Sequence, residues 1–457
     1  MLSRAVVLCL LATLSGPAAA QTLAPTFPVT LHAAVRHATE HYPAIVAAAA
    51  RVAAQESSVD LARTAYLPRL DSSLQFNRAT RNNVSGLLLP GTTIPGISGP
   101  VTDHPSATTI WGSGAGVLVS WEAFDFGLRS ASIGVAQSQA ARAAATAALT
   151  RLEIGVRTAD AFLRLAAAQE TLRAARANLE RQEVFSNSVI TLVKNELRPG
   201  ADESRAQAEL AFARIQLIQA EQAEQVARAG LAQWLGASPS DVQIATESVM
   251  QGPPSADPTP ATPAAHPLAQ TQQAAVESSK ALQRVFDRAF YPRFHFQGAY
   301  AARGTGVTAA GVELGGAAGL GLDSSNFAFG VTATFPLFDW FSLRERRRIE
   351  AHNERAEGAG YERVVRELTA QSQQANAEMA GARRIAENTP IQLASARVLE
   401  QQSRARYDAG LATIIEVADA QRLLLQAEVG DAVARLAVWR AWLNEVVARG
   451  DVSRLLP

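Results

Sequence analysis

Two acidic residues in the C-terminal part of the chain have a spacing that could serve chemistry. Glu416 and Asp419 stand three positions apart, so on a helix both carboxylates lie on one face. If several copies of the chain met at a narrow end, these carboxylates would form a ring that favours cations and resists closure unless cations or partners screen it. The alternative is that acids in the first turn of a helix, after a glycine turn, complement its positive end.

A group of histidines is the other arrangement that could hold a ligand. His37 and His41 have the i, i+4 spacing of two metal ligands on one helix face, with Glu40 and His32 nearby. The alternative, which we favour, is a surface helix that happens to be rich in histidine. No P-loop, G-x-S-x-G or dinucleotide motif occurs in its strand–helix context. We therefore predict no catalytic residue, no cofactor and no metal, and we do not expect an enzyme.

The first residues predict export. Arg4 provides a short positive region, an apolar run covers 5–14, and a cleavage site of small residues precedes Gln21. A membrane-anchoring first helix is the alternative, but the run is well short of the ~20 apolar residues that span a bilayer. Removal of a signal peptide at 1–20 also removes Cys9, the single cysteine. Disulfide bonds, cysteine–zinc sites and cysteine nucleophiles are therefore excluded.

Composition bounds the class of protein. The 457 residues include 42 basic and 42 acidic side chains, which gives no electrostatic signature for nucleic acid or anionic lipid. Aromatic residues make up only 6% while alanine is abundant, which suits long, closely packed helices. After the first twenty residues, no apolar run is long enough to be a membrane helix. If the chain crosses a membrane, we expect a β-barrel, because only helices and closed barrels satisfy the backbone in lipid.

The sequence contains an internal duplication. Two proline-bounded segments, 43–68 and 267–292, have the same length, and each is followed by an arginine and a stretch of alternating polarity. Further on, VLVSWEAFDF at 117–126 matches VTATFPLFDW at 331–340. Both matches occur in the same order, which indicates a tandem repeat.

Each copy continues as a long helix, a glycine turn at Gly200 or Gly410, and a returning helix. We predict repeat 1 over 21–251 and repeat 2 over 268–457. A proline-rich linker at 252–267 joins them, since its prolines exclude a helix.

Each repeat also contains two strand-like runs with period-two alternation. These runs are predicted over 70–80 and 112–126 in repeat 1, and over 293–303 and 327–339 in repeat 2. One face of each run is apolar and the other is small or polar, which is the pattern of a membrane barrel with its apolar side toward lipid. Ordinary hairpins packed on a soluble core have the same alternation and are the alternative.

Four strands cannot close a barrel, since even the smallest bacterial barrels need about eight. Several chains must therefore share one barrel, and a threefold assembly would give twelve strands with closed cyclic symmetry. The loops within each strand pair, 80–110 and 304–325, are rich in glycine, serine, threonine and proline and are expected on the outer side. In such an assembly, the Glu416 and Asp419 ring would contain six acidic groups.

Long helices make up most of each repeat. No proline occurs from Leu128 to Arg198, and apolar residues recur there at spacings of three and four, as in a coiled coil. A helix of about 70 residues is ~105 Å long, which suits a tube across the periplasm. Pro390 interrupts the corresponding helix of repeat 2 and is expected to kink or break it near 387–389. A soluble helical bundle explains these helices, but it does not explain the strand pairs.

The segment YDAGLATIIEVADAQ at 407–421 strongly resembles the hairpin tip of TolC-like outer-membrane efflux proteins. The Phe-Asp pairs at 124–125 and 338–339, the proline-bounded helices and the duplication agree with this resemblance, which covers essentially the whole mature chain. It implies a helix-dominated membrane protein with a β-barrel, in which each chain of a homotrimer gives four strands to a 12-stranded barrel above a long periplasmic coiled-coil tunnel.

The resemblance also implies location and activity. It places the chain in the outer membrane of a Gram-negative bacterium, with a periplasmic adaptor protein and an inner-membrane pump as partners. The implied activity is passive, gated export of small molecules or proteins in a tripartite efflux or type I secretion system. The alternative is a periplasmic coiled-coil adaptor or scaffold without a channel.

Residue roles at the tips follow from the same resemblance. Aspartates at the positions of Glu416 and Asp419 line the periplasmic constriction in the family. Tyr407 and Asp202 match a tyrosine and an aspartate that latch its closed state. The arginine of that latch is absent, because Ala412 stands in its place, so the closed state of this chain needs another lock.

The two tips are predicted near 199–202 and 408–413, with Gly200, Gly410 and Leu411 as candidates for adaptor docking. We expect the first tip to be about four residues shorter, a deletion that removes roughly one helical turn and keeps the helix face.

Overall fold

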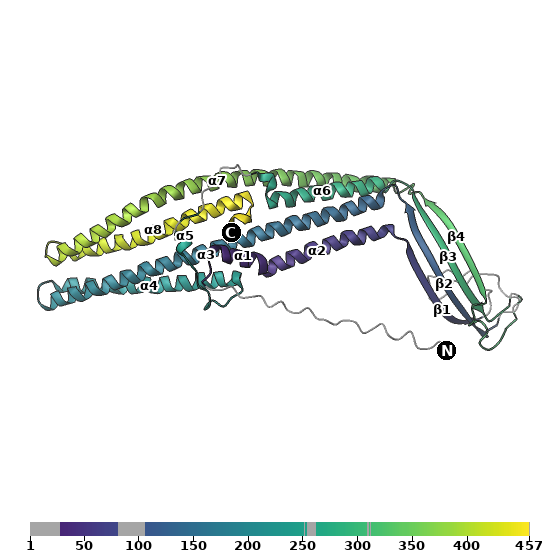
Figure 1. Ribbon diagram of the computed structural model, residues 1–457, viewed down its shortest axis with the longest axis horizontal. Helices are drawn as coiled ribbons and strands as arrows, with labels where there is room; N and C mark the ends of the chain where they lie inside the picture. Colours follow the sequence, from purple (N-terminus) through teal and green to yellow (C-terminus); the bar gives the residue numbers. More distant parts are fainter. Residues whose placement is uncertain are drawn as a thin grey trace. The chain divides into compact units, whose positions relative to one another are not determined.

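The computed structural model describes residues 28–80, 106–250, 252–253, 262–308, 310 and 312–456. The predicted signal peptide and the middle of the predicted linker, 254–261, lie outside these residues. In chain order (Figure 1) the elements are α1 (Leu31–His41), α2 (Pro43–Arg63), η1 (Thr64–Tyr66), β1 (Arg69–Thr80), β2 (Thr109–Phe124), α3 (Leu128–Lys194), α4 (Gly200–Leu235), α5 (Glu247–Met250), η2 (Pro263–Ala265), α6 (Pro267–Arg288), β3 (Arg293–Thr305), β4 (Ser324–Thr334), α7 (Trp340–Asp408), α8 (Ile414–Arg449) and η3 (Val452–Leu455).

These elements form two compact units. The first contains the described residues of 1–48, 148–266 and 366–457, and the second those of 49–147 and 267–365. The long helices α3 and α7 continue from the second unit into the first. Each predicted repeat contributes to both units. The division into repeats thus describes a duplication of the sequence, and it stays a prediction.

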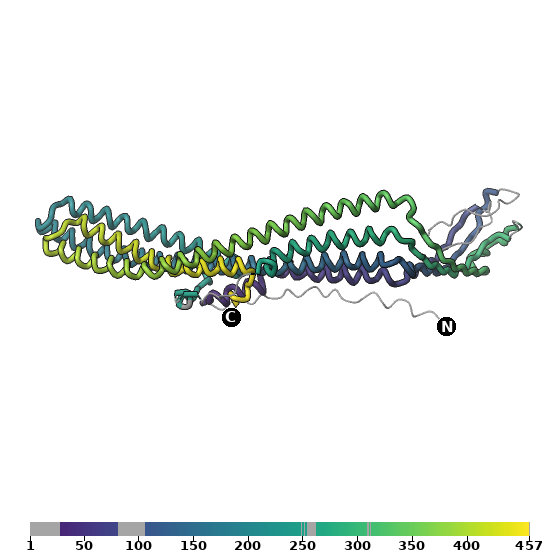
Figure 2. Tube along the Cα trace, turned by 90° about the horizontal axis from the view of Figure 1, so that it is seen from above, coloured from purple at the N-terminus to yellow at the C-terminus, as the bar shows by residue number. Residues whose placement is uncertain are grey.

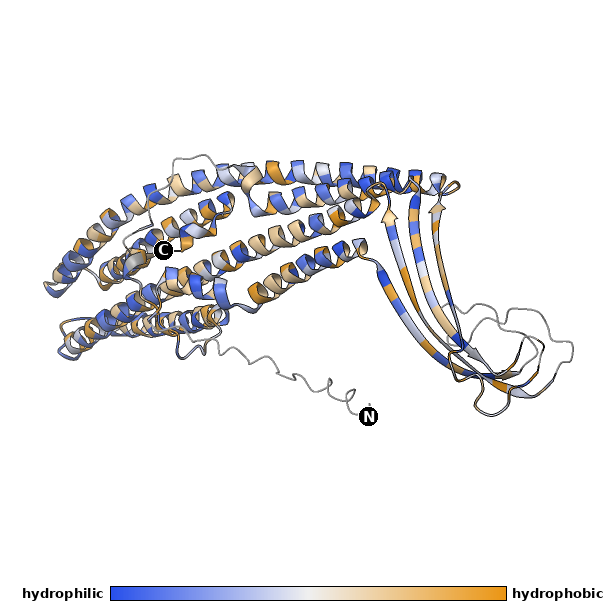
Figure 3. Ribbon diagram, turned by 45° about the vertical axis from the view of Figure 1, so that its right-hand side comes forward, coloured by the Kyte–Doolittle hydropathy of each residue, from blue (hydrophilic) through white to orange (hydrophobic). Residues whose placement is uncertain are grey.

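The second unit holds one antiparallel sheet of four strands in the order β1-β2-β3-β4. The strand register places large apolar residues opposite each other: Val117 lies opposite Tyr300, and Tyr300 lies opposite Phe327. Because successive side chains point to opposite faces, these rows make one face apolar, and the alternation is visible along the strands in Figure 3. The exposed large apolar side chains of this face are Leu70, Leu74, Phe76, Val117, Trp121, Phe296, Tyr300, Phe327, Phe329 and Val331.

Two strands end earlier than the sequence predicted, β2 at residue 124 rather than 126 and β4 at residue 334 rather than 339. Asp125 ends β2, because its carboxylate accepts hydrogen bonds from the backbone N–H groups of Gly127 (3.1 Å) and Arg129 (2.6 Å) as the chain turns into α3. Pro336 follows β4, and proline cannot donate to a strand ladder.

Polar side chains join α6 to α7 in the second unit. Gln272 Nε2 donates to Glu357 Oε2 at 2.5 Å, and Gln283 Nε2 donates to Glu354 Oε2 at 2.7 Å. Gly360 makes room for the first contact, since a Cβ atom there would lie 2.7 Å from Gln272 Nε2. The helices therefore pack closely without large apolar residues at these positions.

The first unit has the main apolar core. Parts of α1, α3, α4 and α8 supply its buried side chains, including Phe162, Leu231, Trp439 and Trp442. Trp439 Nε1 donates to the carbonyl of Val249 at 2.6 Å, so the indole is paired although it is buried. Within the part of the chain that the structure describes, no helix combines the length and apolar character needed to cross a membrane.

The long helices repeat with one constant spacing. Both α4 and α8 contain 36 residues, and both end at a glycine with left-handed φ, Gly236 at 62° and Gly450 at 73°. The last residues of α3 and α7, Lys194 and Asp408, are 214 positions apart, as are the first residues of α4 and α8. Five residues therefore connect the helices at each tip. The predicted four-residue shortening of the first tip is wrong.

Of the two outcomes expected at Pro390, a kink or a break of the second long helix, the break is wrong. Helix α7 runs without a break through this residue (Figure 1). Two neighbours hold the backbone there: Asn388 Nδ2 donates to the carbonyl of Arg384 at 2.7 Å, and Thr389 Oγ1 donates to Asp431 Oδ1 on α8 at 2.9 Å. Both side-chain contacts come from the two residues that directly precede the missing N–H of Pro390.

Candidate functional site

The two hairpin turns of the first unit have the same backbone geometry. Two positions after the end of each long helix stands a residue with left-handed φ, Glu196 at 56° and Gly410 at 76°. The next residue closes the turn in both cases, because Leu197 N–H donates to the carbonyl of Leu192 (2.9 Å) and Leu411 N–H donates to that of Arg406 (2.7 Å). This pattern is the Schellman motif. In Figure 2 both hairpins end at the same side of this unit.

The equivalence of the turns corrects the role predicted for Gly200. That residue is the first of α4 and follows Pro199, so the positive φ of the first turn belongs to Glu196 instead. No residue pattern indicates this conformation, because glutamate rarely adopts it. The predicted turn glycine of the second tip, Gly410, does have positive φ.

A leucine is exposed at each tip. Leu197 is 67% exposed and Leu411 is 71% exposed. Leu411 was a candidate for docking from the sequence, and its counterpart Leu197 was not. The constant spacing between the two tips identifies it.

Tyr407 lies at the centre of a buried cluster close to the turns. Its side chain is fully buried and meets the ring of Phe185 on α3 edge to face, with centroids 5.4 Å apart. The cluster also contains Val189, Ala206, Ala412, Ile414 and Val417. It joins the hairpin of α3 and α4 to the hairpin of α7 and α8.

Tyr407 and Asp202, predicted as partners, are brought together. The phenol donates to Asp202 Oδ2 at 3.1 Å across the two hairpins. Burial, and then the Asp202 carboxylate, raise the pKa of Tyr407 to about 12. The phenol therefore stays a neutral donor throughout the physiological range.

Arg198 was not identified from the sequence. Its Nη2 donates to the carbonyl of Tyr407, and its guanidinium carbon lies 4.2 Å from the centroid of the Tyr407 ring. Arg198 lies in the connection between α3 and α4, and Tyr407 lies in the last turn of α7. This contact therefore also joins the two hairpins.

The predicted acidic pair has local partners in the chain. The Glu416 carboxylate accepts the N–H of Thr413 at 3.1 Å in a capping box, and it lies 3.7 Å from Arg406 Nη1. Asp419 pairs with Arg422 at 2.8 Å. Both carboxylates are half-exposed, which leaves them free to meet solvent or another chain. Within one chain, Glu416 thus acts as the alternative predicted, as an acid that caps the start of a helix. The ring of carboxylates stays a prediction.

Comparison with known proteins identifies the group to which these tips belong. The model of the outer membrane efflux protein family matches residues 34–237 and 264–444, which is more than half of the chain. The chain belongs to the outer membrane efflux protein family. Members of this family are channels of the Gram-negative outer membrane with a large periplasmic helical part. The predicted family and location are confirmed.

Individual relatives support the same assignment. The efflux protein is 30% identical over 204 residues to Protein CyaE of Bordetella pertussis. That match covers 44% of this chain and 38% of CyaE, so it spans well under half of the relative's length.

Solved structures show the fold. The outer-membrane channel OprN matches with a TM-score of 0.73 at 19% identity, over 92% of this chain and 89% of that chain. The outer membrane protein VceC of Vibrio cholerae matches with a TM-score of 0.72 at 18% identity, over 92% and 96%. The predicted TolC-like fold, with four strands per chain and long helices, is confirmed.

The histidines of the efflux protein have structural partners. His37 Nε2 forms a hydrogen bond with the carbonyl of Leu235 at 3.2 Å, and His41 Nδ1 forms one with the carbonyl of His37 at 3.1 Å. Burial, and then the neighbouring His41, lower the pKa of His37. Among the described residues, no group of three or more potential ligands could hold a metal.

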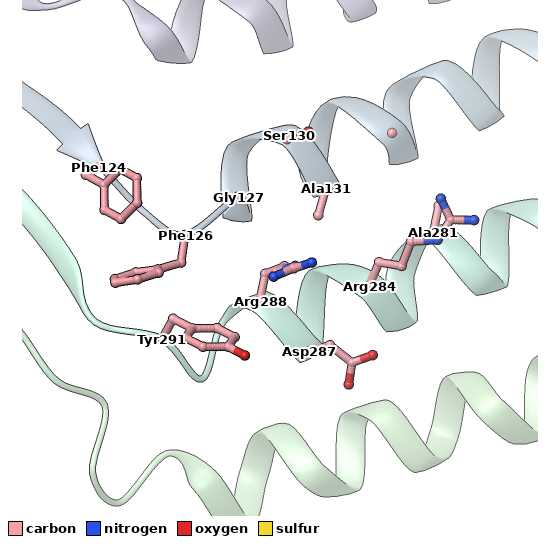
Figure 4. A pocket seen from close by; sticks show the side chains of 11 residues that line it. Phe124, Phe126, Gly127, Ser130, Ala131, Ala281, Arg284, Asp287, Arg288 and Tyr291 are labelled. Atoms are coloured by element: carbon pink, nitrogen blue, oxygen red, sulfur yellow. The ribbon is translucent and has the colours of Figure 1, made fainter.

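A pocket of about 730 Å³ lies in the second unit, where β2 passes into α3 (Figure 4). Phe126 and Tyr291 stack over its wall with centroids 5.4 Å apart, and the Arg288 guanidinium lies 6.0 Å from the Tyr291 ring. Asp287 on the same wall is paired with Arg347 at 2.5 Å. Because the charges of the pocket are paired and its rings stack on each other, we interpret it as a packing contact where β2 passes into α3.

Proposed function

We propose that three copies of this efflux protein form an outer-membrane channel for passive, gated export. The observation that carries the proposal is the four-stranded sheet with one apolar face and two open edges, β1 and β4. An isolated sheet with exposed edges pairs with further strands, and closure into a barrel removes the edges. Three such sheets supply twelve strands, within the range of bacterial barrels.

The proposal includes partners and cargo. The exposed Leu197 and Leu411, together with Gly410, are the surface offered to a periplasmic adaptor, and through it to an inner-membrane pump. The cargo, small molecules such as drugs and metals or else proteins, follows from the pump, because a passive duct has no energy source of its own. Co-purification with the adaptor and pump encoded beside the gene tests this, with Leu197→Asp and Leu411→Asp expected to reduce capture.

Detergent extraction tests the channel itself. We expect the mature protein to leave the membrane only with detergent, to run as a heat-modifiable trimer, and to conduct ions in planar bilayers. A soluble monomer would contradict the channel and would favour the alternative of a periplasmic adaptor or scaffold.

The acidic ring has its own test. Replacing both carboxylates, in Glu416→Gln with Asp419→Asn, is expected to reduce cation selectivity, since a ring of charge sets the ion preference of a narrow pore. Glu203→Gln, an acid in the first turn of α4, is the control and should leave selectivity unchanged. Unchanged selectivity in the double variant would remove Glu416 and Asp419 from the constriction.

A further inference from the structure

Arg198, in the turn of the first tip, contacts the end of α7 in the other hairpin. Arg198 and Ala412 each lie two residues after the left-handed residue of their turn, so they occupy equivalent positions 214 residues apart. We propose that Arg198, from the first tip, holds the gate closed by clamping the end of α7. The proposal rests on the proposed channel function.

The main contact of Arg198 is with the end of a helix. The last carbonyls of a helix have no intrahelical N–H partner and form its negative end, where a cation is stabilising. Tyr407 is the second-last residue of α7, and its carbonyl accepts the Arg198 guanidinium in addition to the N–H of Gly410 at 3.0 Å. The cation comes from the neighbouring hairpin and not from α7, so the contact ties two hairpins together.

The same guanidinium also covers the Tyr407 ring, 4.2 Å from its centroid. An arginine over an aromatic face gains cation–π attraction, which grows as the pair is removed from water. Tyr407 is fully buried, and Arg198 is half-buried. Lysine has no planar group to stack in this way, so we expect it to replace arginine only in part.

Arg198 and Asp202 act as one clamp. They lie four residues apart on the segment that starts α4, and they hold Tyr407 at opposite ends, its carbonyl and its phenol. Separation of the hairpins must break both contacts at once. Ala412, at the equivalent position of the second tip, is buried in the apolar cluster beside them.

Conductance of purified trimers in planar bilayers tests the clamp. We expect Arg198→Ala to raise the occupancy of the open state roughly tenfold, Arg198→Lys to raise it less, and Tyr407→Phe to raise it as well. Lys194→Ala is the matched control, because it removes an exposed cation from the last turn of α3 and should change nothing.

The outcomes separate the lock from the channel. If Tyr407→Phe opens the channel while Arg198→Ala leaves it as closed as the wild type, the lock is overturned and the channel stands. If no variant and no wild-type trimer conducts, both fall. Should Arg198→Ala fail to assemble, Arg198→Gln keeps the length of the side chain without its charge, and a closed Arg198→Gln trimer overturns the lock equally.

Discussion

At the scale of single residues, Tyr407 joins the two hairpins through three kinds of contact. Its ring packs on Phe185, its phenol donates to Asp202, and its carbonyl accepts from Arg198. A buried phenol without a partner costs free energy, so the pairing with Asp202 decides whether the buried position is stable. Tyr407 therefore connects the apolar packing of the tip with the charged side chains of Asp202 and Arg198.

Alkaline pH is expected to release this contact. The pKa of Tyr407 is raised from 10 to about 12 by burial and by Asp202, so the folded state favours the neutral phenol. The resulting stabilisation is complete below pH 10 and is lost as the pH rises toward about 12. We expect the open-state occupancy in planar bilayers to rise across this window in the wild type.

Tyr407→Phe is the control for this pH response. Phenylalanine keeps the ring in the cluster but has no proton to lose, so its occupancy should not change across the same window. An equal response in both proteins, or a wild-type response well below pH 10, would show that another group titrates.

The sequence predicted part of this site, and the reason is physical. Tyr407 and Asp202 stand in a recognisable motif, and the structure brings them into contact. Arg198 was missed because its partner lies 209 positions away and is a backbone carbonyl, which no side-chain pattern reveals. Glu196 was missed because its left-handed φ comes from the closure of the turn and not from its residue type.

At the scale of elements, the helices depend on small residues at close approaches. Alanine and glycine positions allow helices to lie near each other, and the tight places can be located individually. In α3, a Cβ atom on Gly155 would lie 2.6 Å from Val452 Cγ2 and 3.4 Å from Thr39 Cγ2. The C-terminal η3 and α1 both pack against this glycine.

Gly155→Ala is therefore expected to destabilise the first unit by about 1–3 kcal/mol, because the added methyl forces neighbours to move. Gly230→Ala is the matched control on α4, where nothing lies within 4 Å of the added atom. There alanine reduces the conformational freedom of the unfolded chain, which should stabilise the helix by about 0.5–1 kcal/mol. Thermal unfolding of the two variants measures the difference, and equal shifts would contradict the packing at Gly155.

Pro390 gives the second prediction about elements. Since α7 is continuous through this proline, Pro390→Ala restores one hydrogen bond and should stabilise the helix by about 3 kcal/mol. Gly381→Ala in the same helix, with open space around it, should gain only about 1 kcal/mol. The order of the two melting temperatures tests this, and a lower melting temperature for Pro390→Ala would show that the proline is needed.

The elements were predictable where one rule governs them. The long proline-free run predicted α3 to within a few residues, and period-two alternation predicted all four strands. The prediction of a shortened first tip is wrong because the turn residue is Glu196 and not Gly200. Once Glu196 is recognised as the turn residue, one spacing of 214 fits both hairpins.

At the scale of the whole molecule, the exposed faces of one chain need explanation. A soluble protein rarely exposes ten large apolar side chains on one sheet face. The opposite face of the same strands carries small and polar residues, such as Ser73, Gln75 and Thr332, in the same register. This division matches lipid on one side and water on the other, and it defines which substitutions the assembly tolerates.

Neighbouring residues of β4 test the division into an apolar and a polar face directly. They lie at nearly the same position along the strand, but their side chains point to opposite faces. Phe329 is 77% exposed on the apolar face, and Ala328 precedes it on the opposite face. Phe329→Lys is expected to cost about 2–4 kcal/mol per chain if it lies near the bilayer midplane, since the cation must enter lipid. Ala328→Lys would face water and should leave the amount of heat-modifiable trimer in the outer-membrane fraction almost unchanged. Equal yields of the two variants would mean that the apolar face does not meet lipid, and the proposed channel would lose its support.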